Sequence, residues 1–178
     1  KFYANTFGGT VFVTKDGGIV YNLPEGKDVR GLDSYDVTRD SPKAVALKEM
    51  LIGARQKEPQ GINKTETKVN IFKGNDPSKW KTSIETYEIV SIGEIYDGIE
   101  LNLRAYGKNV EKLFYVKPGA DPHGIKIKVE GGKKLDIADT GELIVETGHG
   151  DIRFTKPVAY QEIDGKRKDV DVAYHKTS

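Results

Sequence analysis

The chain has 178 residues, of which 28 are basic and 27 acidic, and its formal net charge is +1. Because these charges nearly cancel, the chain has no overall attraction to nucleic acid or to an anionic membrane, and we expect neither as a partner. Cysteine is absent, which excludes disulfides, thiolate nucleophiles and cysteine-ligated zinc. No apolar run approaches the roughly 18 residues of a membrane-spanning helix, and no leader opens the sequence, so we expect any export signal to have been removed or never to have existed.

Short stretches of alternating apolar and polar residues recur along most of the chain, which is typical of half-buried strands. The first two, over 10–14 and 19–21, are joined by an Asp-Gly turn at Asp16. Later hairpins are predicted to turn near Gly107, Gly141 and Gly165. About ten to thirteen short strands at this spacing predict an all-β fold with little helix, either an antiparallel two-sheet sandwich or a distorted barrel.

Two segments are harder to assign. Residues 44–52 follow Ser41-Pro42, which fits a capped helix with proline at its first position, and the pattern slightly favours that helix over a strand in which Glu49 is out of place. Residues 56–67 crowd polar side chains around one apolar residue, Ile62, and predict an exposed loop. The front part, 1–55, is too small to fold alone, so we expect a single β domain over 1–178.

From Lys68 onward the chain carries a run of distinctive strings. They are Asn70-x-Phe72, Gly74-Asn75-Asp76-Pro77-Ser78-Lys79-Trp80, Thr86-Tyr87, Tyr96-x-Gly98-Ile99-Glu100-Leu101, Glu111-x-x-Phe114-x-Val116-x-Pro118-Gly119-Ala120-Asp121-Pro122, and Lys156-Pro157-Val158-Ala159-Tyr160-Gln161-Glu162. In this order they resemble the uncharacterised domain that precedes SBBP-type β-propeller repeats in large exported bacterial and archaeal surface proteins. The resemblance covers 68–175 well and 1–55 more loosely.

This resemblance implies a location outside the cell or on its surface, and other domains of a larger surface protein as partners. No activity is established for that domain. The resemblance also favours a strand over 44–52, since that region is extended in the family. The chain departs from the family pattern at Glu100, where an aspartate is expected.

The first candidate binding site is the string around Trp80. Asp76 before Pro77 predicts a one-turn helix that the aspartate caps. Trp80 beside Asn75 and Asp76 is a combination suited to stacking on a sugar, with Tyr87, Tyr96 or Tyr115 as further platform residues. The alternative is that Trp80 is a core side chain under the capped turn, and this is favoured because a lone tryptophan usually packs.

A second candidate is Asp121, which can cap Pro122 in the same way or act with His123 as a ligand or acid–base group. One histidine and one carboxylate are too few for a specific metal site, and the structural interpretation is favoured. Glu100 and Glu111 flank one hairpin and are the best candidates for a paired-carboxylate glycosidase, although cross-strand pairing with Arg104 or Lys112 is the more ordinary role. We therefore assign no catalytic residue, no metal and no cofactor.

Three functions remain open. The favoured one is a non-catalytic structural or adhesive module of an exported cell-surface protein. The second is a carbohydrate-binding module that uses Trp80, and it requires that side chain to be exposed. The third is a glycan-active enzyme, which requires Glu100 and Glu111 to converge in a cleft.

Overall fold

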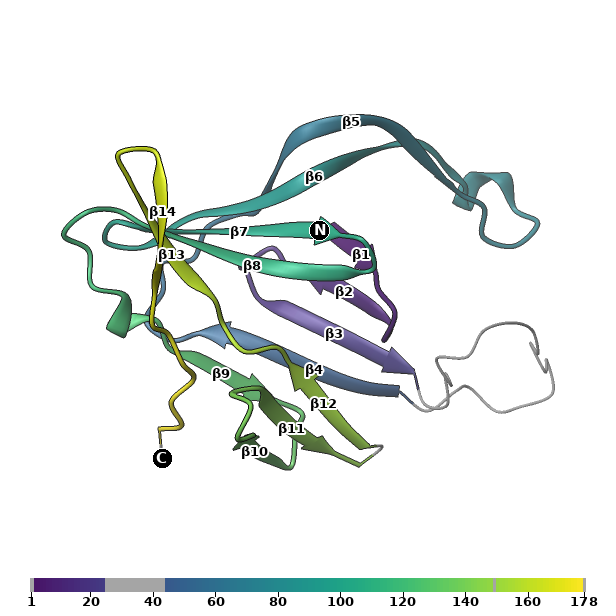
Figure 1. Cartoon of the computed structure of the whole chain (residues 1–178). Helices are drawn as coiled ribbons and strands as arrows, with labels where there is room; N and C mark the ends of the chain where they lie inside the picture. Colours follow the sequence, from purple (N-terminus) through teal and green to yellow (C-terminus); the bar gives the residue numbers. More distant parts are fainter. Residues whose placement is uncertain (1, 25–43, 149, 178) are drawn as a thin grey trace. The chain divides into compact units, whose positions relative to one another are not determined.

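A computed structural model describes residues 2–24, 44–148 and 150–177 (Figure 1). Its contacts divide the chain into two compact units, Lys1–Val129 and Glu130–Ser178. A single domain over 1–178 stays a prediction. Across the described residues there are fourteen strands and two short 3-10 helices, so the predicted all-β class with little helix is confirmed.

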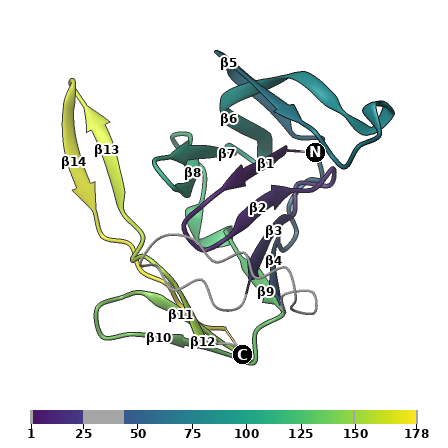
Figure 2. The same cartoon turned by 90° about the vertical axis from the view of Figure 1, so that its right-hand side faces the viewer.

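The first unit contains two antiparallel sheets, which Figures 1 and 2 show as separate layers. The five-stranded sheet has the order β1-β2-β3-β4-β9, with β1 Phe2–Asn5, β2 Thr10–Val13, β3 Ile19–Pro24, β4 Ala44–Leu51 and β9 Ile127–Glu130. The four-stranded sheet has the order β5-β6-β7-β8, with β5 Gln60–Ile71, β6 Lys81–Tyr96, β7 Ile99–Tyr106 and β8 Asn109–Val116. The helices η1 Pro77–Lys79 and η2 Pro122–Gly124 belong to the same unit.

The core of this unit lies between the two sheets. Val11, Val13 and Ile19 come from the first sheet. Ile92, Ile95, Leu101 and Leu103 come from the second. All seven belong to one buried cluster, so the two sheets pack face to face as the predicted sandwich. Strands β2 and β7 alternate buried and more exposed positions, as strands with one buried face do.

Residues 44–51 form strand β4, so the helix favoured by the local pattern is wrong and the strand implied by the family resemblance is confirmed. Leu47 pairs with Tyr21, and Glu49 pairs with Ile19, on β3. Leu47 and Glu49 both point into the sandwich and are buried. Glu49 is tolerated there because its carboxylate accepts hydrogen bonds from Tyr21 and Lys112. The expected cap at Ser41 and Pro42 lies outside the described residues.

The loop predicted over 56–67 is mostly wrong, since β5 begins at Gln60. This strand pairs along β6, from Gln60 opposite Ser91 to Ile71 opposite Lys81. It is an edge strand, and most of its residues are exposed. A strand without a buried face needs no apolar alternation, so its polar sequence was indistinguishable from that of a loop.

The second unit holds the remaining five strands. A three-stranded sheet contains β10 Lys134–Ile137, β11 Leu143–Thr147 and β12 Gly150–Phe154, and a hairpin contains β13 Ala159–Ile163 and β14 Lys166–Val170. The predicted turn at Gly141 connects β10 to β11, and the predicted turn at Gly165 connects β13 to β14. Asp164 and Gly165 both have positive φ, of 52° and 70°, as a tight two-residue hairpin turn requires. Val145 is fully buried in this unit.

Candidate functional site

The β5–β6 hairpin is the most prominent feature of the first unit. Figure 1 shows both strands continuing past the ends of β7 and β8 before they turn. The part of β6 that enters the core begins near Val90, while residues 70–83 around the turn are all exposed. We call residues 70–83 the hairpin tip. They present side chains to solvent at the end of a long two-stranded arm.

Local sequence builds the tip. The Asp76 side chain accepts hydrogen bonds from the Ser78 backbone N–H at 3.0 Å and from the Ser78 hydroxyl at 2.7 Å. Pro77 occupies the first position of η1, and Gly74 turns the chain with a φ of 63°. The predicted aspartate-capped turn is therefore confirmed. The hydrogen bonds from Ser78 hold the pKa of Asp76 below its ordinary value, because they favour the charged carboxylate.

Trp80 is exposed and is held in a fixed position. Its indole N–H donates to the Gly74 carbonyl at 3.1 Å. Its ring meets Phe72 edge to face, with centroids 5.2 Å apart and planes at 90°. Trp80 is 40 % exposed and Phe72 62 % exposed. The interpretation of Trp80 as a core side chain is wrong, because the turn that holds it lies beyond the core.

The tip carries an excess of positive charge. Lys73, Lys79 and Lys81 face a single carboxylate, that of Asp76, within residues 70–83. The Lys79 Nζ lies 3.5 Å from the Asp76 Oδ2, whereas neither Lys73 nor Lys81 forms an ion pair with any described residue. The Asn75 side chain also lacks a hydrogen-bond partner among the described residues. The tip therefore combines two fixed aromatic rings with polar groups that are available for a ligand.

The six candidate residues do not form one site. Asn75, Asp76 and Trp80 lie at the tip, while Tyr96 ends β6 at its other end. A strand of 16 residues spans roughly 50 Å, so the tip and Tyr96 are far apart.

Tyr115 and Asp121 lie toward the Tyr96 end of the sheet. Tyr115 is opposite Glu100 on β7, near the turn that follows Tyr96. Asp121 caps η2 by accepting from the His123 N–H at 3.0 Å, which confirms its structural role. Tyr96 donates to the Ile52 carbonyl, and partial burial raises the pKa of its phenol. Tyr96 and Asp121 thus hold local structure.

Tyr87, also considered as a platform residue, has a structural role as well. Its ring packs edge to face on Phe2 at 5.9 Å and lies over Gly61 of the neighbouring strand. Its hydroxyl donates to Glu85 at 2.9 Å. These contacts place Tyr87 where the hairpin joins the sandwich, so it does not extend the surface of the tip.

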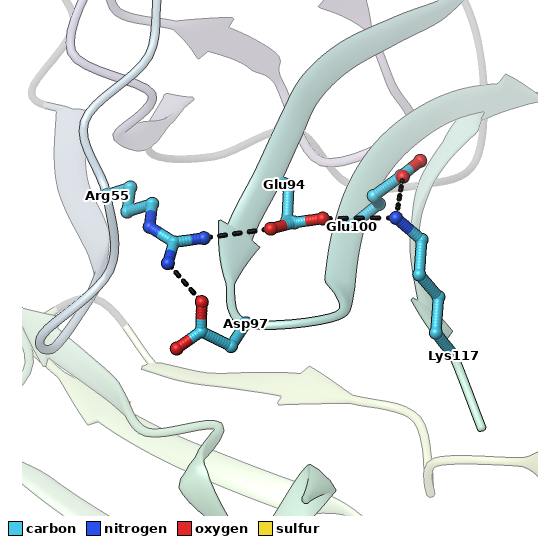
Figure 3. A network of polar contacts seen from close by, with 5 residues as sticks. All are labelled: Arg55, Glu94, Asp97, Glu100 and Lys117. Carbon is cyan, nitrogen blue, oxygen red and sulfur yellow. Dashed lines mark hydrogen bonds and ion pairs between the residues drawn. The ribbon is translucent and has the colours of Figure 1, made fainter. Parts of the chain in front are cut away.

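A network of charges lies at the β6–β7 turn (Figure 3). Arg55 pairs with Glu94 and Asp97, and Lys117 pairs with Glu94 at 3.0 Å and with Glu100 at 3.1 Å. The Lys117 hydrogen bond, followed by the charge of Lys117 and the contact with Arg55, lowers the pKa of Glu94. Neighbouring carboxylates raise the pKa of Lys117 and of Arg55. The ion pairs therefore favour the charged forms of Glu94, Lys117 and Arg55. This suits a structural role, in which the network connects the β6–β7 turn to the segments that carry Arg55 and Lys117.

The strand register separates Glu100 from Glu111. Glu111 lies opposite Arg104, four positions along β7 from Glu100. Four residues of strand span about 13 Å, more than the separation that either glycosidase geometry uses. Glu100 pairs with Lys117, and Glu111 accepts from Arg104 at 2.6 and 3.1 Å. The ordinary cross-strand pairing is confirmed for Glu111.

Sequence reasoning missed the buried polar group between the sheets. Both Glu49 carboxylate oxygens lie 2.7 Å from the Lys112 Nζ, and one also accepts from the Tyr21 hydroxyl at 2.9 Å. Glu49 is only 4 % exposed. The sequence did contain a signal for this group, because Glu49 occupies an apolar position of the predicted strand. A carboxylate at such a position needs a hydrogen-bonding partner from elsewhere in the chain.

No group of three or more His, Cys, Asp or Glu side chains that could hold a metal ion occurs in 2–24, 44–148 or 150–177. His123 is the basic residue in the last turn of η2, and His149 lies outside the described residues. In the part of the chain that the structure covers, no helix has the length and apolar character for a membrane crossing.

Comparison with known proteins assigns the chain to a family. The sequence profile of a family described as a domain of unknown function, DUF7948, matches residues 1–178. No curated protein and no solved structure matches the chain.

Proposed function

The chain belongs to the DUF7948 family, and we propose that it works as a non-catalytic adhesive or structural module of an exported cell-surface protein. The resemblance to the domain ahead of SBBP-type repeats supports this setting, with the other domains of the larger protein as its partners. The absence of cysteine is compatible with an exported microbial domain. Under this proposal the sandwich is the rigid support and the β5–β6 hairpin makes the adhesive contact.

The exposure of Phe72 and Trp80 at the hairpin tip is the observation that carries the proposal. Large aromatic side chains are usually buried, because burial of each removes a large apolar area from water. Here the chain forms two long strands, a proline turn and an aspartate cap, and the two rings remain partly exposed to solvent. A purely structural spacer has no need of such an arm, whereas an adhesive module does.

Carbohydrate binding is the second candidate, and the same observation favours it. An exposed, fixed indole beside amide, carboxylate and ammonium groups can stack on a sugar ring and bind its hydroxyl groups. This candidate is narrower than the first, because it assigns the adhesive contact to a glycan. The tyrosines once grouped with Trp80 have no part in it, since they lie elsewhere.

Glycan-active enzyme chemistry has the least support. The two carboxylates considered for it lie on one sheet face but four strand positions apart, and each has a cationic partner. Incubation of the chain with a panel of polysaccharides should yield no reducing ends above those of a heated sample.

An adhesion assay tests the proposal. Beads that carry the whole chain are mixed with intact cells or extracellular matrix of the source organism, and beads that carry Trp80→Ala serve as the comparison. Retention by the wild-type chain and its loss in Trp80→Ala support an adhesive tip. Equal retention on both kinds of bead would place the contact elsewhere, and no retention at all would leave only a structural module.

A further inference from the structure

We propose that the hairpin tip binds an acidic polysaccharide, with one sugar ring stacked on Trp80 and the carboxylates of uronate residues next to Lys73 and Lys81. This inference rests on the adhesive function proposed above and names its ligand class. Uronate polymers combine the two features that the tip recognises, a pyranose ring with an apolar face and a regular series of negative charges.

The aromatic part of the tip is preorganised. The indole N–H is already bound to the Gly74 carbonyl, and the edge of one ring packs against the face of the other. Stacking on Trp80 therefore requires little additional ordering of the side chain, and binding loses less conformational entropy. The indole N–H is not available to a ligand, so polar recognition falls to the neighbouring side chains.

The positive charge of the tip favours a negatively charged ligand. Lys73 follows Phe72 in the chain and Lys81 follows Trp80, so both lysines belong to the same exposed segment as the two rings. Neither lysine has an ion-pair partner among the described residues, while the Asp76 carboxylate is engaged by Ser78 and Lys79. The chain as a whole carries only +1, so this excess is local. A negative ligand complements it, and a neutral glycan would leave it unused.

The shape of the tip disfavours a lipid surface. The turn between Phe72 and Trp80 carries Asn75, Asp76 and Ser78, and the indole is bound to Gly74 of the same turn. Insertion of the indole into the acyl region would carry the Asp76 carboxylate toward the membrane with it, which is costly. Residues 70–83 contain no arginine, which disfavours a polynucleotide as the ligand.

Binding of polygalacturonate to the whole chain tests this inference, with neutral dextran as the comparison ligand. Because Trp80 is the only tryptophan, its fluorescence reports binding directly. We expect saturable binding of polygalacturonate that weakens steeply with salt. We expect Trp80→Ala, and separately the double variant Lys73→Gln/Lys81→Gln, to weaken binding by about tenfold or more in a surface-immobilised assay. Trp80→Phe should retain part of the affinity.

Phe7→Ala is the matched control, since Phe7 is also exposed and lies 4.7 Å from the Lys108 Nζ. This variant should bind polygalacturonate as the wild type does. Equal affinity for dextran, unchanged affinity in the lysine variant, or tighter binding of phosphatidylserine vesicles or single-stranded DNA would overturn the inference. Retention of cells that depends on Trp80 but is not accompanied by polygalacturonate binding would overturn it as well, while the adhesive function would stand.

Discussion

The Glu49 carboxylate and the Lys112 Nζ meet between the two sheets, with both oxygens 2.7 Å from the nitrogen. Glu49 comes from β4 of one sheet and Lys112 from β8 of the other. Their side chains are 4 % and 17 % exposed. Breaking a buried pair leaves an uncompensated charge, whereas replacing both partners by apolar groups is often neutral.

We therefore expect Lys112→Met to lower the free energy of unfolding by about 3 kcal/mol or more, because it leaves Glu49 buried without its cation. The double variant Glu49→Leu/Lys112→Met should recover most of that loss. Urea denaturation of the wild type, both single variants and the double variant measures the coupling. Arg104→Met is the exposed comparison, and loss of its pair with Glu111 should cost under about 1 kcal/mol. A double variant whose destabilisation equals the sum of the two single variants would show that the pair is not coupled.

Gly98 should tolerate a side chain less well than Gly107. Both have positive φ, of 69° and 59°, so alanine at either position is strained by about 1–2 kcal/mol. A Cβ at Gly98 would also lie 2.9 Å from the Ala120 Cβ, whereas a Cβ at Gly107 meets open space. Gly98→Ala is therefore expected to lower the melting temperature more than Gly107→Ala. An equal loss of melting temperature in both variants would contradict the close packing of Ala120, which precedes η2, against the β6–β7 turn.

The charge network in Figure 3 should contribute to stability at neutral pH and not in acid. Lys117 and Arg55 hold the pKa of Glu94 below its ordinary value, so the unfolded chain binds a proton to Glu94 at higher pH than the folded chain does. This contribution is complete above the unfolded value of about 4.3 and is lost as the pH falls through the lowered folded value.

Glu94→Gln should accordingly lower the melting temperature at pH 7 and converge on the wild type in acid. Melting curves from pH 7 to pH 2 measure the difference. Glu66→Gln is the control, because Glu66 has no ion-pair partner among the described residues, and its curve should parallel that of the wild type. A constant difference between Glu94→Gln and the wild type across the pH range would refute the electrostatic account.

Asp76 should order the tip without stabilising the sandwich. Its loss in Asp76→Ala removes the cap of η1, and caps contribute about 1 kcal/mol to local structure. The tip lies beyond the core, so global unfolding should change little. We expect the emission of Trp80 to shift to longer wavelength as its ring becomes more exposed. Asp121→Ala removes the equivalent cap of η2 and should leave that emission unchanged.

The sequence reveals the features that depend on neighbouring residues. The Asp-Gly turns and the Asp-Pro caps were predictable because their hydrogen bonds close within a few residues. Strand β4 was misleading because the partner that makes Glu49 acceptable is 63 residues away. Strand β5 was missed because an edge strand exposed on both faces lacks an apolar pattern.

The candidate site was half predictable for the same reason. The string around Trp80 encodes its own turn, cap and polar groups, so Asn75, Asp76 and Trp80 do lie together. Grouping them with Tyr96 and Tyr115 required knowledge of where the strands end. The length of β6 separates the two sets, and strand ends depend on pairing that the local sequence does not specify.

The central claim is that the hairpin tip is the adhesive surface of this domain, and retention of source cells or matrix on beads that carry the whole chain tests it most directly. Wild-type and Phe7→Ala beads should retain equal amounts of material, and Trp80→Ala beads should retain little. Equal retention on all three would contradict the account, because the exposed aromatic pair would then have no part in adhesion.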